Sequence, residues 1–92
     1  MIYDRHKGVI LMDSRVAVIS IIVEKESAVN DLNALLHQYG QYIIGRLGLP
    51  YRARNVNIIC VAIDAPNDSI NALTGALGRI DGINAKATYS QV

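Results

Sequence analysis

The sequence predicts an α+β fold in which elements follow the order βαββαβ, with a four-stranded antiparallel sheet and both helices on one face. Two runs of mostly β-branched and other apolar residues, 15–24 and 56–64, are typical of strands buried on both faces. Each run is followed by an amphipathic helical pattern and then by a weaker strand pattern. The two halves also resemble each other, because residues 18–24 align with residues 58–64. A repeat of this kind is typical of the split-βαβ arrangement.

The first fourteen residues show no clean period. We interpret residues 1–14 as an N-terminal arm or extension of a core domain at 15–92. The first strand of that domain is predicted over 15–24. A helix is predicted over 28–39, because leucines recur along one face and Ser27 can act as its N-cap.

The second strand is predicted over 41–49 and has the weakest pattern of the four. Gly45 and Gly48 interrupt it, and Pro50 is expected to end it. Glycine and proline are tolerated at the edge of a sheet, where one row of backbone groups has no partner. We therefore place this strand at an edge.

The second half follows the same order. A short turn at 52–55 leads to the strand at 56–64, and Pro66 with the polar residues after it opens a second helix. The last strand is predicted over 83–90. The buried stripe of the second helix is expected to consist of Ile70, Leu73, Leu77 and Ile80.

These elements match the ferredoxin-like fold, in which the first and third strands are central. Alternation divides each central strand into a bulkier set of side chains, suited to lie beneath the helices, and a second set that is half apolar. The bulkier set consists of Ile19, Ile21, Val23, Ile59, Val61 and Ile63. Because both helices cover the same face, the second set has no cover within a monomer, and we expect another copy or a ligand to bury it. This candidate interface consists of Val18, Ser20, Ile22, Ile58, Cys60 and Ala62.

Composition restricts the classes of partner. The chain has 92 residues, of which 51% are hydrophobic, with no Phe or Trp and a net charge of +1. The apolar excess favours assembly into a dimer or tetramer, and the scattered basic residues do not favour direct nucleic-acid binding. A single cysteine suits a reducing cytosol, and the apolar run at 16–23 is too short to cross a membrane. We expect a cytoplasmic protein with no membrane contact.

No pattern in the sequence predicts catalysis. The chain contains no Ser-His-Asp set, no spaced carboxylate pair and no metal-ligand cluster, so we expect a non-enzymatic protein without a cofactor or metal. Cys60 could be a redox thiol or a metal ligand, but we favour the role of a small buried hydrophobe. For His37 we favour a structural role near the end of the first helix.

Glycine and arginine give a second, weaker set of candidates. The segment from Gly45 to Gly48 lacks the Lys-Ser/Thr of a phosphate loop, so a β-bulge or a close backbone contact is favoured. Gly75 lies inside the second helix, where we expect close helix–sheet packing to explain it. An anionic effector could still contact Gly45, Arg46, Gly75 and Arg79, with Arg52 and Arg54 nearby. For these arginines, however, rim salt bridges or a solvated surface position are favoured.

Two segments resemble a known family. Residues 42–52 (YIIGRLGLPYR) and 72–82 (ALTGALGRIDG) are similar to the small proteins named as regulators of the iron-only hydrogenase system. The resemblance extends over about residues 15–90. It implies an ACT-like ferredoxin fold, similar to the effector domain of the nickel-responsive transcriptional regulator, and a regulatory function.

The sequence lacks several functional features of the proteins that are expected to share its fold. The nickel-responsive regulator carries a DNA-binding segment and several metal-binding histidines, whereas this chain has only His6, His37 and Cys60 as candidate ligands of these types. ACT domains that bind amino acids usually have a glycine in the first strand-to-helix loop, which here is Glu24-Lys25-Glu26-Ser27. The main hypothesis is therefore a regulatory and oligomerisation domain that acts through a protein partner. The alternative is a sensor whose small effector binds at the subunit interface.

Overall fold

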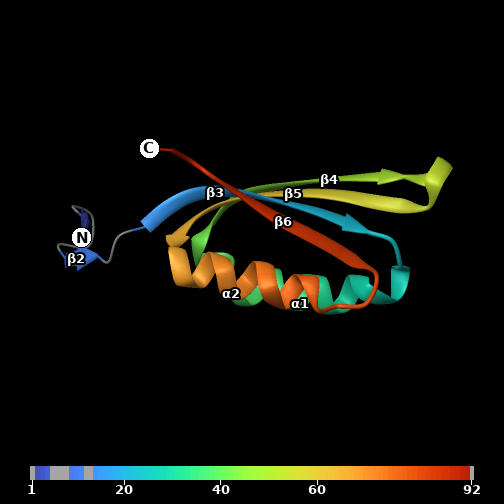
Figure 1. Cartoon of the computed structure of the whole chain (residues 1–92), viewed down its shortest axis with the longest axis horizontal. Helices are drawn as coiled ribbons and strands as arrows, with labels where there is room; N and C mark the ends of the chain where they lie inside the picture. The colour runs from blue at the N-terminus through green and yellow to red at the C-terminus, as the bar shows by residue number, and fades with distance from the viewer. Residues whose placement is uncertain (1, 5–8, 12–13, 92) are drawn as a thin grey trace.

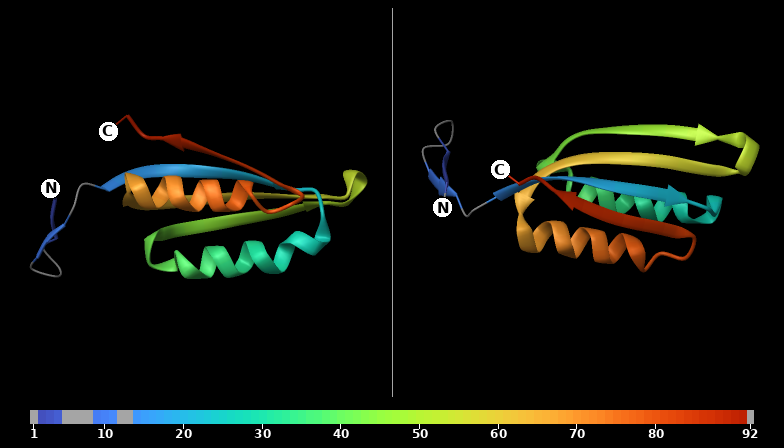
Figure 2. Two further views of the ribbon diagram at one scale, coloured as in Figure 1. Left: turned by 60° about the horizontal axis from the view of Figure 1, so that its bottom comes forward. Right: turned by 45° about the horizontal axis from the view of Figure 1, so that its top comes forward.

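The computed structural model describes residues 2–4, 9–11 and 14–91, and it describes side chains over 14–91. Four strands form one antiparallel sheet in the order β4-β5-β3-β6, and the two helices lie together on one side of it (Figures 1 and 2). These elements are β3 (Ser14–Val23), α1 (Val29–Gln38), β4 (Ile43–Tyr51), β5 (Val56–Pro66), α2 (Asn67–Gly78) and β6 (Ile83–Tyr89). The predicted ferredoxin-like βαββαβ fold is confirmed.

The short strands β1 (Ile2–Asp4) and β2 (Val9–Leu11) lie in the predicted N-terminal arm. They pair with each other in a separate two-stranded sheet. Residues 1, 5–8, 12 and 13 of the arm lie outside the described residues, and His6 is among them.

The start of α1 differs from the prediction. Glu26–Ala28 forms a 3-10 turn, and Ser27 lies inside that turn instead of capping the helix; no side chain makes a capping hydrogen bond there. The backbone N–H of Ala28 instead donates to the carbonyl of Lys25 at 3.0 Å. A main-chain hydrogen bond, and no side-chain cap, therefore marks the start of this helical segment.

The edge position of β4 is confirmed, but its bounds are shifted by two residues. Gly40–Tyr42 forms a 3-10 turn, which delays the start of the strand to Ile43. Pro50 does not end the strand. It can lie inside an edge strand because one row of backbone groups there has no ladder partner. The expected bulge is present, since the register shifts between Ile43 and Gly45.

The core lies between the sheet and the helices. Every bulky residue assigned to the helix side of the two central strands is buried, and so are the α1 and α2 leucines that face them. On the predicted stripe of α2, Ile70, Leu73 and Leu77 are fully buried, and Ile80 packs against the core while partly exposed. The alternation of the central strands thus correctly divides covered from uncovered positions.

The chain turns tightly between α2 and β6. The backbone N–H of Glu24 donates to the carbonyl of Gly82 at 2.7 Å, and Lys25 forms an ion pair with Asp81 at 2.6 Å. Gly82 has a φ of +89°, in the region that favours glycine. A Cβ built on Gly82 would lie 2.6 Å from Cβ of Lys25, so a side chain does not fit there without movement.

Candidate functional site: the uncovered face of the sheet

The side of the sheet opposite the helices, here called the open face, is covered by none of the helices or strands over residues 14–91 (Figure 2). Its centre is made by three cross-strand pairs between β3 and β5. The pairs are Val18 with Ala62, Ser20 with Cys60, and Ile22 with Ile58. All six residues predicted for the interface are therefore neighbours on one surface. Whether they form an interface stays a prediction.

β4 extends the open face to the edge of the sheet, which the sequence analysis missed. Leu47 lies opposite Cys60 and Leu49 lies opposite Ile58, so their side chains share the face of those residues. Leu47 is 58% exposed and Leu49 is 53% exposed, and Tyr51 continues the same row. The signal was present in the sequence: apolar residues 47, 49 and 51 alternate with Arg46, Gly48 and Pro50.

The apolar character of the open face fades across the sheet. Val16 and Val18 on β3 are both exposed. On β6, at the other edge, the positions that share this face are the polar residues Asn84, Lys86 and Thr88, which pair with Ile22, Ser20 and Val18. Asp64 pairs with Val16 and adds a carboxylate. The strands of this face thus carry one acidic and one basic side chain, Asp64 and Lys86, beside a continuous apolar area.

Cys60 lies at the middle of the open face, and it is exposed. The expectation of a small buried hydrophobe is wrong for the monomer, because Cys60 belongs to the set of side chains that the helices do not cover. Within residues 14–91, no three His, Cys, Asp or Glu side chains come close enough to hold a metal ion. His37 occupies the expected place, in the last turn of α1, and is exposed.

The four candidate effector-contacting residues lie on two separate elements. Gly45 and Arg46 are on β4, where Arg46 donates a hydrogen bond to Oδ1 of Asn33 on α1 at 3.3 Å. Gly75 lies on α2, and Arg79 is the C-cap residue one turn further along. Close helix–sheet packing does not explain Gly75, which is exposed; a Cβ there would meet only the Arg79 side chain, at 3.5 Å. The two pairs therefore lie on different elements and have different neighbours.

The family follows from comparison with known proteins. Residues 15–87 match the TM1266-like family, described as "Iron-only hydrogenase system regulator, putative". The solved structure of uncharacterized protein TM1266 from Thermotoga maritima is 35% identical, and the match covers 86% of this chain and 100% of that chain with a TM-score of 0.83. The chain belongs to this family. No curated protein sequence matches it significantly.

More distant solved structures share the fold alone. The C-terminal domain of the MgtC protein from Mycobacterium tuberculosis is 12% identical, with a TM-score of 0.63 over 88% of this chain and 95% of that domain. A formyltetrahydrofolate deformylase from Pseudomonas putida KT2440 is 14% identical, with a TM-score of 0.58 over 79% of this chain and 28% of the enzyme. In the part of the chain that the structure describes, neither α1 nor α2 is long and apolar enough to cross a membrane.

Proposed function

We propose that this chain is a non-enzymatic regulatory domain that assembles with a second copy through its open face and acts on a protein partner. Membership of a family named for regulation supports the regulatory role. The observation that supports assembly is the apolar area around Cys60, made by paired residues of β3, β4 and β5. A contiguous apolar area on a small chain is the usual mark of an interaction surface.

Energetics favour burial of this area. Val16, Val18, Leu47, Leu49 and Tyr51 are 42–58% exposed. Covering a half-exposed side chain of this size contributes about 1 kcal/mol. Five such contributions from each of two copies come to about 10 kcal/mol, which exceeds the lower part of the cost of association, about 4 to 15 kcal/mol.

Charge favours a second copy of the same chain as the occupant. A surface that packs against itself places like residues near one another, so a strongly charged face would repel its own copy. The strands of the open face carry one acidic side chain, Asp64, and one basic side chain, Lys86. Their charges cancel, and they lie away from the apolar area of β4.

Sedimentation of the full chain tests the proposal. We expect dimers or tetramers at micromolar concentration, and Val18→Asp and Leu47→Asp should each raise the dissociation constant at least about 100-fold, because burying an unpaired carboxylate is costly. Both positions are exposed in the monomer, so circular dichroism should be unchanged. Ala72→Asp, on the exposed side of α2, is the matched control.

Cys60 supplies an independent readout because it is the chain's single cysteine. Its reaction with a thiol reagent should slow as the protein concentration rises, and it should be fast at all concentrations in Leu47→Asp. A wild-type chain that stays monomeric at micromolar concentration would contradict the proposal. Equal effects of Leu47→Asp and Ala72→Asp would contradict the assignment of this face.

A further inference from the structure

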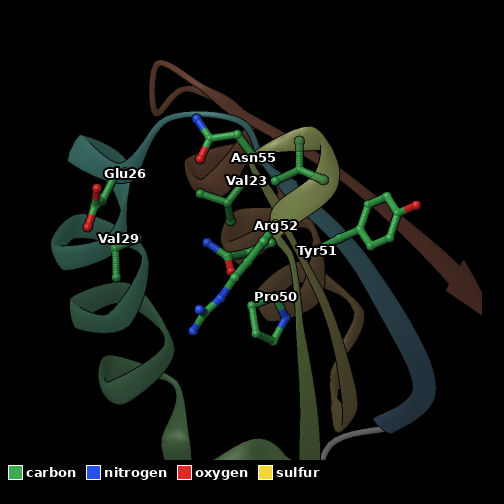
Figure 3. Close-up of a pocket in the computed structure, with 9 residues that line it drawn as sticks. Val23, Glu26, Val29, Pro50, Tyr51, Arg52 and Asn55 are labelled. Atoms are coloured by element: carbon green, nitrogen blue, oxygen red, sulfur yellow. The ribbon is translucent and has the colours of Figure 1, made fainter.

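A groove lies on the helix side of the sheet, between the first half of α1 and the end of the β4–β5 hairpin (Figure 3). Two adjoining hollows of about 250 and 280 Å³ form it, and they share Val23, Val29, Pro50 and Asn57. The hairpin carries the 3-10 turn Arg52–Arg54 at its tip and reaches beyond the helix layer (Figure 1). Leu49 and Tyr51 of the open face border the two hollows along the edge strand, but the floor of the groove lies on the helix side of the sheet.

The groove exists because β4 presents no bulky apolar side chain toward α1. The residues of β4 on the helix side are Arg46, Gly48 and Pro50, which lie opposite Val61, Ile59 and Asn57 of β5. A Cβ built on Gly48 would have no atom within 4 Å. Space that a side chain would fill is therefore open to solvent or to a ligand.

The floor of the groove is apolar. Val23 and Leu32 are each 1% exposed, and Ile59 is 7% exposed. Val29, partly buried, contributes to the α1 wall. A ligand that uses this floor has an aliphatic part, and the size of the hollows restricts it to a small molecule.

The walls are polar and carry more positive than negative charge. Arg46 and Arg52 come from the β4 side, and Glu26 comes from the α1 side. In Figure 3 the Arg52 side chain reaches across the pocket toward α1, while the ring of Tyr51 points the other way. Among the described residues neither guanidinium forms an ion pair, and the hydrogen bond of Arg46 is to a neutral amide. Donors therefore remain available on both arginines.

We propose that the groove binds a small organic carboxylate with a short aliphatic body. The carboxylate would be held by paired hydrogen bonds from Arg52, while Arg46 in the adjoining hollow adds positive charge, and the body would rest on Val23, Leu32 and Ile59. As an effector site this inference rests on the regulatory role proposed above, but the binding itself does not.

Calorimetric titration of the full chain with 4-methylvalerate tests the inference, and 4-methylvaleramide is the neutral control of the same shape. We expect the acid to bind and the amide to bind at least about tenfold more weakly, since a hydrogen bond to a charged group is the stronger kind. Inorganic phosphate separates the two parts of the site, because it offers charge without an aliphatic body. Equal affinity for the acid and the amide, phosphate binding as tight as the acid, or no binding of the acid would each overturn the inference.

Variants locate the site. Arg46→Gln and Arg52→Gln should each raise the dissociation constant about tenfold, and Arg54→Gln is the matched control because Arg54 lies on the same hairpin outside the groove lining. Gly48→Leu should fill the groove and remove binding. If that variant fails to fold, Arg52→Gln still tests the inference, because Arg52 is exposed and its substitution should leave the fold intact. An Arg52→Gln effect no larger than that of Arg54→Gln would overturn the inference. Sedimentation of the same variants should be unchanged, so failure of this site is distinguishable from failure of assembly.

Discussion

The two halves of the molecule repeat the same elements, yet their edge strands have different surroundings. In the second half, Ala85 and Ala87 of β6 pack against the core on the helix side, where α2 lies. In the first half, the helix-side residues Arg46 and Gly48 of β4 are exposed. One helix rests on its edge strand, and the other leaves a groove beside it.

Register shows that these positions are equivalent. Ala85 pairs with Ile21 of β3, and Arg46 pairs with Val61 of β5. Ile21 and Val61 occupy the same place in the repeat, since residues 18–24 align with 58–64. The bulge between Ile43 and Gly45 inserts one extra residue into β4. From Gly45 onward, each β4 residue therefore lies opposite the β5 residue that its predecessor would face without the bulge.

The same correspondence relates Ala87, opposite Ile19, to Gly48, opposite Ile59. A small apolar side chain at each β6 position allows the helix to approach the strand. At the β4 positions, Arg46 has a long polar side chain and Gly48 has none, so the helix does not cover the strand there. Two positions on each edge strand therefore separate the half that is closed under its helix from the half that leaves a groove.

The largest effect is expected from moving the β4 side chain into the β6 position. Ala85→Arg should lower the free energy of unfolding by about 3 kcal/mol, because a long charged group must enter a partly buried site beneath α2. Arg46→Ala should change it by less than about 0.5 kcal/mol, since Arg46 is exposed and its hydrogen bond to Asn33 lies at the surface. Urea unfolding measures both. Similar losses in the two variants would show that the halves do not differ as described.

The ends of the two helices provide the next test. Gly82→Ala should cost about 2 kcal/mol, because alanine is unfavourable at a φ of +89° and its Cβ meets Lys25. Gly40, after α1, has no atom within 4 Å of a built Cβ and no positive φ, so Gly40→Ala should be nearly neutral. Thermal unfolding of the pair distinguishes them, and a neutral Gly82→Ala would contradict the tight turn.

The smallest effect compares the second pair of equivalent positions. Ala87→Val should destabilise the protein by about 1 kcal/mol, since added methyl groups overpack the space under α2. Gly48→Val should be neutral or stabilise by about 0.5 kcal/mol, because the space is empty and valine favours strands. Urea unfolding of both variants is the measurement. A stabilised Ala87→Val would indicate unfilled space beneath α2.

Most of the fold could be predicted from period and composition. The alternation in β3 and β5 correctly assigned Ile19, Val61 and their neighbours to the covered side, because burial under two helices requires bulky side chains at every second position. The helix start at Ser27 was wrong, because a main-chain 3-10 turn competes with a side-chain cap and both suit the same residues. Gly75 was also misinterpreted, although the predicted stripe of Ile70, Leu73, Leu77 and Ile80 places position 75 on the opposite, exposed side of α2.

The candidate sites, like the fold, could be predicted from the sequence only in part. The six central residues of the open face could be named in advance, since strand parity alone groups them, and the alternation of 47, 49 and 51 could have added the β4 row. The grouping of Arg46 and Arg52 with Val23, Leu32 and Ile59 could not be predicted, because these residues come from three strands, a helix and a turn.

By itself the sequence determined which residues form strands and helices, which side of each central strand is apolar enough to be covered, and which strand tolerates an edge. These are properties of local period and residue type. The tertiary structure alone decided that α1 stands away from β4 while α2 rests on β6, and that Arg46 and Arg52 line hollows floored by Val23, Leu32 and Ile59. Such features depend on register, on a one-residue bulge and on the space between packed layers, which arise only when distant segments meet.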